Sequence, residues 1–227
     1  MKIIGFWHVA LVGCAERIFP QQWLKLKESG LYDASDKIYV HVVGTEDPDR
    51  APSPEPNKIG FPADVMNDPK VVFSTTGTRY VFEYPTLNMV HEAAMNSAEP
   101  FYAYYIHTKG ATTANHFIPN AAYWWGQYIE HYAITKWKAN VAKLDEGYDI
   151  SGVEWRDGPS PHFSGNFWWA RSEYLAKLPH AQEYWHKWKH DRIMAEMYIG
   201  LAAPKYHCFM NTGQNLYLYS CTKDMWS

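Results

Sequence analysis

Hydrophobic and polar positions follow two periods along the chain. Short apolar runs rich in β-branched and aromatic residues predict buried strands, whereas apolar positions three and four residues apart predict helices. The strands expected on this basis are residues 3–12, 37–43, 70–75, 101–110, 148–155 and 216–219. The expected helices are residues 16–29, 83–96, 121–144, 174–178, 181–189 and 192–201. Because strands and helices alternate, the pattern predicts a single α/β domain over residues 1–227, with a mostly parallel central sheet flanked by helices.

Residues 101–110 combine a buried strand with chemically useful side chains at its end. The apolar run FYAYYI is followed directly by His107, Thr108, Lys109 and Gly110. In open α/β sheets, ligands bind just beyond the carboxyl ends of the strands. A hydroxyl, an ammonium and a glycine that admits close backbone approach are suited to an anion. The other interpretation is a buried strand followed by an ordinary polar turn.

Composition narrows the function classes. A hydrophobic content of 47% provides for a sizeable core, and a net charge of -3 gives no basic excess for nucleic-acid binding. The chain is rich in aromatics, with 11 Trp, 17 Tyr and 10 Phe, which serve first in core packing and second in stacking on sugar faces. The three cysteines, Cys14, Cys208 and Cys221, do not make a disulfide framework and suit a reducing compartment.

The N-terminus has two interpretations. Residues 3–12 resemble the apolar region of a short secretory signal, but the preceding basic region is a single Lys2 and His8 interrupts the run. We therefore interpret it as the first strand. No later segment is long and apolar enough to span a bilayer, so we expect no transmembrane segment and a cytoplasmic location.

Two motifs together carry a resemblance to a known family. YIHTKG ends the central strand and is followed by a Trp-containing helix, and SGNFWWARSEYL begins at residue 164 and is followed by Leu-Pro. The pair resembles the nucleotide-sugar glycosyltransferases of GT-A type, in particular the rhamnan-synthesis glycosyltransferase family and small chlorovirus-type glycosyltransferases. The order of elements matches over residues 1–210, and the motifs match over 101–125 and 162–179.

The resemblance implies a fold and an activity. The fold would be a single Rossmann-like GT-A domain. The activity would be transfer of a sugar from a nucleoside-diphosphate donor such as a UDP-sugar to a glycan hydroxyl, with inversion, as in polysaccharide biosynthesis. L-rhamnose is the sugar to which the family name points. The donor and the glycan acceptor are the expected partners.

The resemblance also implies a divalent metal, Mn²⁺ or Mg²⁺, held by an Asp-x-Asp at the end of a central strand. This sequence has His107-Thr108-Lys109 there instead. Either Lys109 supplies the positive charge beside the diphosphate, or His107 is a metal ligand, with His207 as a further candidate.

An Asp-x-Asp spelling does occur elsewhere in the chain. Asp47-Pro48-Asp49 lies within residues 44–69, which contain six prolines and no sustained period. We expect a loop there, with both carboxylates solvated.

By the resemblance, donor binding falls on residues around the first and central strands: His8, Arg79, Glu83, His107, Thr108 and Lys109. Two of these have structural alternatives. His8 is equally well a core histidine with a satisfied hydrogen bond. Arg79 suits a bidentate phosphate contact, whereas Glu83 is also an ordinary first-turn charge favoured by the helix dipole.

Acceptor binding falls on the second motif, at His162, Gly165, Asn166 and Trp168. Asn166 suits a hydrogen bond to a sugar hydroxyl, and Trp168 or Trp169 suits stacking on a pyranose face. Because neighbouring strand residues alternate between faces, one of the two tryptophans should face the core.

The general base of an inverting transferase is sought among downstream carboxylates. Glu196 lies between Met194 and Met197, where burial would favour proton uptake, and Asp191 and Asp149 are further candidates. The alternative function is a non-catalytic carbohydrate-binding protein, although such modules are mostly all-β. A histidine-based metallohydrolase lacks any paired ligand spacing.

Overall fold

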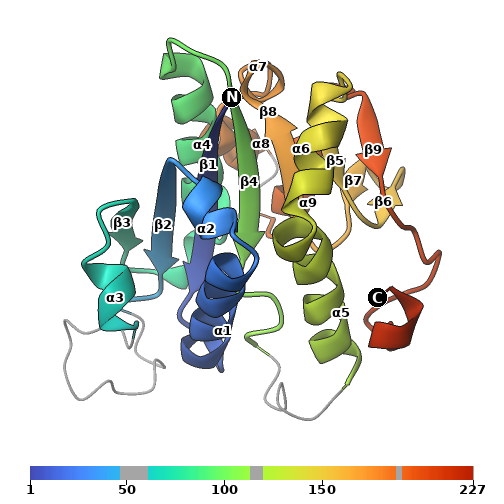
Figure 1. The fold of residues 1–227 in the computed structure, drawn as a ribbon, viewed down its shortest axis with the longest axis horizontal. Helices are drawn as coiled ribbons and strands as arrows, with labels where there is room; N and C mark the ends of the chain where they lie inside the picture. The colour runs from blue at the N-terminus through green and yellow to red at the C-terminus, as the bar shows by residue number, and fades with distance from the viewer. Residues whose placement is uncertain (47–60, 113–119, 188–190, 227) are drawn as a thin grey trace.

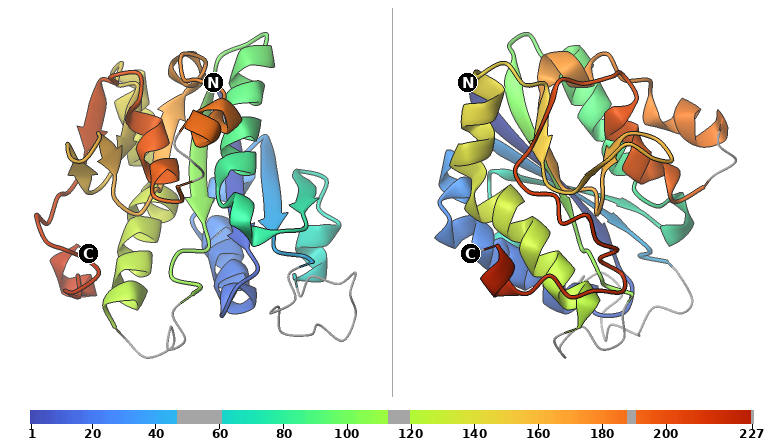
Figure 2. Two further views of the ribbon diagram at one scale, coloured as in Figure 1. Left: turned by 180° about the vertical axis from the view of Figure 1, so that it is seen from behind. Right: turned by 90° about the vertical axis from the view of Figure 1, so that its right-hand side faces the viewer.

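A sheet with helices on both faces forms the centre of the protein (Figures 1 and 2). The computed structural model describes residues 1–46, 61–112, 120–187 and 191–226. Within these residues, seven strands lie in the order β3-β2-β1-β4-β8-β5-β9. Their bounds are β1 (Lys2–Ala10), β2 (Lys37–Val43), β3 (Val71–Thr76), β4 (Phe101–His107), β5 (Ile150–Gly152), β8 (Trp168–Arg171) and β9 (Tyr206–Cys208). Two further strands, β6 (Trp155–Arg156) and β7 (His162–Phe163), form a separate small sheet.

The sheet is mixed but mostly parallel. β8 runs antiparallel to its neighbours β4 and β5, whereas every other neighbouring pair in the large sheet is parallel. The expected α/β architecture with a mostly parallel sheet is therefore confirmed.

Helices cover both faces because both sets of alternating strand residues are apolar. On one face lie α1 (Ala15–Glu28), α2 (Leu31–Ala34), α5 (Ala121–Glu130) and α6 (Trp137–Asp145), which pack against residues such as Trp7, Tyr104 and Trp169. The short α3 (Ala63–Met66) adds Val65 to this cluster. On the other face lie α4 (Tyr84–Asn96), α7 (Ser172–Leu175), α8 (Ala181–Lys187) and α9 (Met194–Met197), which pack against Phe6, Tyr105 and Trp168.

Several expected elements differ from the structure. The strand expected over 148–155 is divided between β5 of the large sheet and β6 of the small one, and the helix expected over 192–201 consists of α9 followed by a 3-10 turn at Tyr198–Gly200. The helix expected over 121–144 is divided into α5 and α6 by a π-helical turn at His131–Thr135. The strand expected over 216–219 is wrong, because Asn215 accepts hydrogen bonds from the Leu218 and Tyr219 N–H groups and its side chain accepts one from Tyr217 N. These local bonds form a turn instead, and the last strand is β9.

In the part of the chain that the structure describes, no helix is both long and apolar enough to cross a membrane.

Candidate functional site

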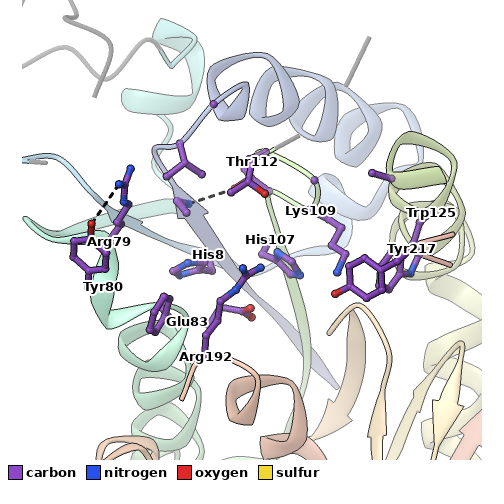
Figure 3. A pocket seen from close by; sticks show the side chains of 18 residues that line it. His8, Arg79, Tyr80, Glu83, His107, Lys109, Thr112, Trp125, Arg192 and Tyr217 are labelled. Carbon is purple, nitrogen blue, oxygen red and sulfur yellow. Dashed lines mark hydrogen bonds between the residues drawn. The ribbon is translucent and has the colours of Figure 1, made fainter. Parts of the chain in front are cut away.

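A pocket lies where the strand order reverses, between β1 and β4 (Figure 3). β1 leads to β2 on one side, and β4 lies on the other, so the segments that follow the two strands diverge and leave a crevice at their carboxyl ends. The pocket has a volume of about 530 Å³, and its walls include His8 and Ala10 of β1 and residues 107–111 at the end of β4. The backbone N–H of Cys14 donates to the Ala111 carbonyl at 2.9 Å, which ties the two segments together.

Lys109 reaches into this pocket as a buried ammonium, with 9% of its surface exposed. Its Nζ lies 3.7 Å from the centre of the Trp125 ring and 5.5 Å from that of Tyr217. The nearest anion is Glu196, whose Oε1 is 4.0 Å from Nζ. Burial lowers the pKa of Lys109, and the negative charges of Glu196 and Glu83 oppose this effect. Among the described residues, Nζ makes no hydrogen bond to a protein acceptor.

Two arginines add positive charge to the pocket wall. Arg79 precedes α4, in the 3-10 turn Arg79–Val81, and Arg192 precedes α9. Figure 3 shows Arg79 and Lys109 on opposite sides of His8 and His107, with Arg192 in front of them. The described lining therefore holds three cationic side chains around a space of ligand size.

The two pocket histidines are uncharged near neutral pH. Burial lowers the pKa of His8 and of His107 to about 3. His8 Nδ1 lies 2.9 Å from Thr86 Oγ1, and His107 Nε2 donates to the Gly165 carbonyl at 2.8 Å. Each ring is thus fixed by one nitrogen, and neither adds charge to the pocket.

Thr108 joins the two central strands at the base of the pocket. Its N–H donates to the His8 carbonyl at 3.2 Å, and its Oγ1 accepts from Ala10 N at 3.3 Å. The side chain is 5% exposed, so it holds the strand ends in register beside any bound ligand.

Gly165 and Asn166 do not line the pocket but hydrogen-bond to residues at or beside it. The Asn166 side chain donates to Glu83 Oε2 at 2.6 Å, and Gly165 N approaches Glu196 Oε2 at 3.4 Å. Asn166 is fully buried and has a left-handed backbone, with φ of 54°. The two motifs of the sequence therefore meet, since the second one contacts His107, Glu83 and Glu196.

Trp168 cannot stack on an acceptor sugar, which corrects the expectation from the sequence. Trp168 and Trp169 are both fully buried. Trp168 stacks on Tyr105 at 5.0 Å and donates its ring N–H to Asn166, and Trp169 donates to the Ala133 carbonyl. As the alternation of strand residues predicts, Trp168 and Trp169 point to opposite faces of the sheet. Because helices cover both faces, neither ring is exposed. His162 is also buried, in β7, and its Nδ1 donates to the Ser160 carbonyl.

The three carboxylates expected to supply the base do not line the pocket. Asp149 immediately precedes β5, which is parallel to β4, so it lies at the opposite end of the sheet and accepts from Lys205 N. Asp191 is exposed, and its Oδ1 accepts from Ile193 N. Glu196 lies in α9, adjacent to Lys109.

The described side chains do not fit a divalent metal. No group of three or more His, Cys, Asp or Glu side chains is placed to hold one in the described ranges. His107 donates through Nε2 to Gly165 and keeps Nδ1, but no group of three possible metal ligands includes it in the described ranges. His207 lies on the edge strand β9 between Tyr148 and Phe209. Asp47 and Asp49 lie outside the described residues.

Some pocket residues were not among the site residues predicted from the sequence. Arg192 and Tyr217 are brought to the pocket from the C-terminal third of the chain, and Trp125 comes from α5. Trp125 was one of many aromatics, and its contact with Lys109 depends on how α5 packs against the end of β4.

The profile of a protein family described as "Domain of unknown function (DUF8361)" matches residues 14–216, which is most of the chain. The match includes the pocket residues from Arg79 to Arg192, but not those of β1 and its end or Tyr217. No curated protein matches the chain.

Proposed function

The chain belongs to the DUF8361 family, whose description assigns no activity, and we propose from its pocket that it is an inverting glycosyltransferase. The substrate would be a nucleoside-diphosphate sugar, and the sugar would pass to a hydroxyl of a glycan. This proposal extends the resemblance of the two sequence motifs to GT-A glycosyltransferases.

The buried ammonium of Lys109 carries the proposal. A charged group out of water is costly unless it is paired and hydrogen-bonded. Lys109 has a ring face and a carboxylate oxygen at 4.0 Å, but no hydrogen bond to Nζ among the described residues. An anion in the pocket would complete its coordination, and Arg79 and Arg192 give the pocket capacity for more than one negative charge.

A diphosphate leaving group matches this charge pattern. As the bond between the sugar and the diphosphate breaks, negative charge grows on the leaving oxygen, and preorganised cations lower the barrier. Lys109, Arg79 and Arg192 would hold the diphosphate, while the neutral His8 and His107 form the wall between them. Because the described residues do not fit a metal, no step is assigned to one.

A non-catalytic carbohydrate-binding protein, the alternative function, would need exposed tryptophans to stack on sugars, and Trp168 and Trp169 of the second motif are the two considered for this role. Both are buried, so neither can serve in that way.

Donor binding tests the proposal. Purified protein is titrated by calorimetry with UDP, GDP and dTDP and with sugar conjugates that include dTDP-L-rhamnose, with EDTA and with Mn²⁺. We expect at least one nucleoside diphosphate to bind. We expect Lys109→Met, which keeps the length and removes the charge, to weaken binding and to lower turnover by about a hundredfold.

The control is Lys177→Met, a lysine exposed on the surface outside the pocket. It should bind and turn over donor like the wild type. Unchanged binding in the Lys109 variant, with its fold verified by circular dichroism, would contradict the role given to Lys109. No binding of any nucleotide to the wild type would contradict the transferase itself.

A further inference from the structure

Glu83 is the carboxylate that lines the pocket, among the lining residues that the structure describes. It stands at the N-cap of α4, and its side chain makes no capping bond there. The interpretation as an ordinary first-turn charge therefore does not account for where the carboxylate points. It reaches away from its own helix, toward β4 and the segment before β8.

One oxygen of Glu83 is held by two donors. Oε2 accepts from the Tyr105 hydroxyl at 2.8 Å and from Asn166 Nδ2 at 2.6 Å. Asn166 is in turn oriented by Trp168, whose ring N–H donates to its Oδ1 at 3.0 Å. Burial raises the pKa of Tyr105 well above its usual value, so the phenol keeps its proton and remains a donor.

The second oxygen of the Glu83 carboxylate, Oε1, is available to a ligand in the pocket. Within the described residues, Glu83 Oε1 makes no hydrogen bond, while Oε2 carries both. Anchoring of one carboxylate oxygen by fixed partners, with the second presented to the ligand space, is the arrangement that a positioned proton acceptor needs.

Other proton acceptors in the pocket are weaker candidates. His8 and His107 have a pKa of about 3 because of their burial, which makes them poor bases near neutral pH. The carboxylate of Glu196 already has two partners, because Oε1 lies 4.0 Å from Lys109 Nζ and Oε2 accepts from Gly165 N at 3.4 Å. It does not line the pocket.

We propose that Glu83 is the general base that takes the proton of the acceptor hydroxyl. This inference rests on the proposed transferase function. As the acceptor oxygen bonds to the anomeric carbon, the bond from that carbon to the diphosphate oxygen breaks. Its electron pair leaves with the nucleoside diphosphate. The hydroxyl proton passes to Oε1, and Glu83 becomes a carboxylic acid that later returns the proton to water. Glu196 is then a positioning residue that acts through Lys109.

The test compares three isosteric variants in nucleoside-diphosphate release from the donor panel above, with water or a glycan as acceptor. Glu83→Gln should lower turnover about a thousandfold, while nucleotide affinity stays within a few-fold of the wild type. Glu196→Gln should keep much more turnover and weaken donor binding. Glu92→Gln, an exposed position on the same helix α4, is the matched control and should resemble the wild type.

Chemical rescue separates a base from a structural group. In Glu83→Ala, added formate should restore a measurable part of the lost turnover, because a small carboxylate can fill the vacated space and accept the proton. Formate should not rescue Glu196→Ala. Tyr105→Phe removes one anchor of Oε2 and should lower kcat with little change in the KM for donor.

The possible results separate the role of Glu83 from the transferase function as a whole. Turnover within tenfold of the wild type in Glu83→Gln, or loss that formate never restores, overturns the assignment of Glu83 and leaves the transferase in place. A wild type that neither binds nor cleaves any donor overturns both.

Discussion

Three histidines, His8 and His41 buried and His107 partly buried, lie side by side across the carboxyl ends of β1, β2 and β4. His41 is in register with His8, and His8 with His107. Because paired residues of neighbouring strands point to the same face, the three rings share the face covered by α4. His41 bonds to Ser74 and Thr76 through its two ring nitrogens. The row thus consists of neutral rings at the edge of the pocket, of which His41 is hydrogen-bonded at both nitrogens and His8 and His107 at one each.

Stability should therefore fall in mild acid. Burial lowers the pKa of His8 and His107 to about 3 and that of His41 to about 4, against 6.5 in an unfolded chain. Between these values the unfolded state binds more protons, so stability is present above pH 6.5 and is lost as the pH falls. The loss is up to about 1.4 kcal/mol per pH unit for each histidine.

Urea unfolding from pH 7 to pH 5 measures this slope. His41→Gln should make it shallower, because one of the titrating groups is gone. His186→Gln, at an exposed position on α8, should leave it as in the wild type. Equal slopes in all three proteins would contradict the link to the buried row.

At the scale of elements, a buried polar chain joins α1 to the end of β4 and to α5. Gln22 of α1 is fully buried and accepts from the Trp7 ring N–H at 3.0 Å. Its amide donates to the His107 carbonyl at 2.9 Å and to Glu130 Oε1 at 2.8 Å. Glu130 also pairs with Lys25. The chain sets the position of His107, and therefore of Lys109, relative to the helices.

Removal of Gln22 should be costly. Gln22→Ala leaves the Trp7 donor and the His107 carbonyl without this partner, weakens the support of the buried Glu130 and opens a small cavity. We expect a loss of about 3 kcal/mol in the free energy of unfolding. Gln21→Ala, the exposed neighbour on the same helix, should change it by less than about 0.5 kcal/mol. Urea titration of both variants decides whether burial of the amide is responsible.

At the scale of the whole molecule, the C-terminal tail returns to the pocket after β9 and lies against α5 (Figure 2). Glu154 is fully buried and accepts from Tyr128, Arg156 and both the N–H and the hydroxyl of Thr212. Farther along the tail, Tyr217 packs edge-on against Trp125 at 4.6 Å. Glu154 therefore fixes the segment that covers Lys109.

Glu154→Gln should loosen this tail. The amide cannot neutralise Arg156 or accept all of these bonds, so we expect at least about 2 kcal/mol of destabilisation. Trypsin cleavage after Lys223 should become faster at conditions where the wild type resists. The matched control is Glu146→Gln, whose carboxylate pairs with Lys143 on the surface. Tail cleavage at the same rate in both variants would show that Glu154 does not anchor the tail.

Much of this organisation could be predicted from local pattern. The strands β1 to β4 and helices α1 and α4 were expected within one to three residues, because each has a strong period and clear end signals. The end of β4, predicted to meet an anion, does line a pocket, and anion binding there stays a prediction. The antiparallel direction of β8 was not predictable, because it depends on which segments pair across a long separation. The turn at residues 215–219 is local, and the apolar residues that follow Asn215 masked the turn signal of that residue.

The sequence by itself determines the spacing of apolar residues that forms strands and helices, and the charged residues at the end of β4. Both depend only on residues that are close together in the chain. Only the tertiary structure decides which side chains meet there. Glu83, Tyr105 and Asn166 are far apart in sequence, and packing of α4 and the segment before β8 against β4 brings them together. The same packing buries Trp168, because a covered sheet leaves neither face to solvent. Asp149 lies at the other end of the sheet because it precedes β5, which runs parallel to β4.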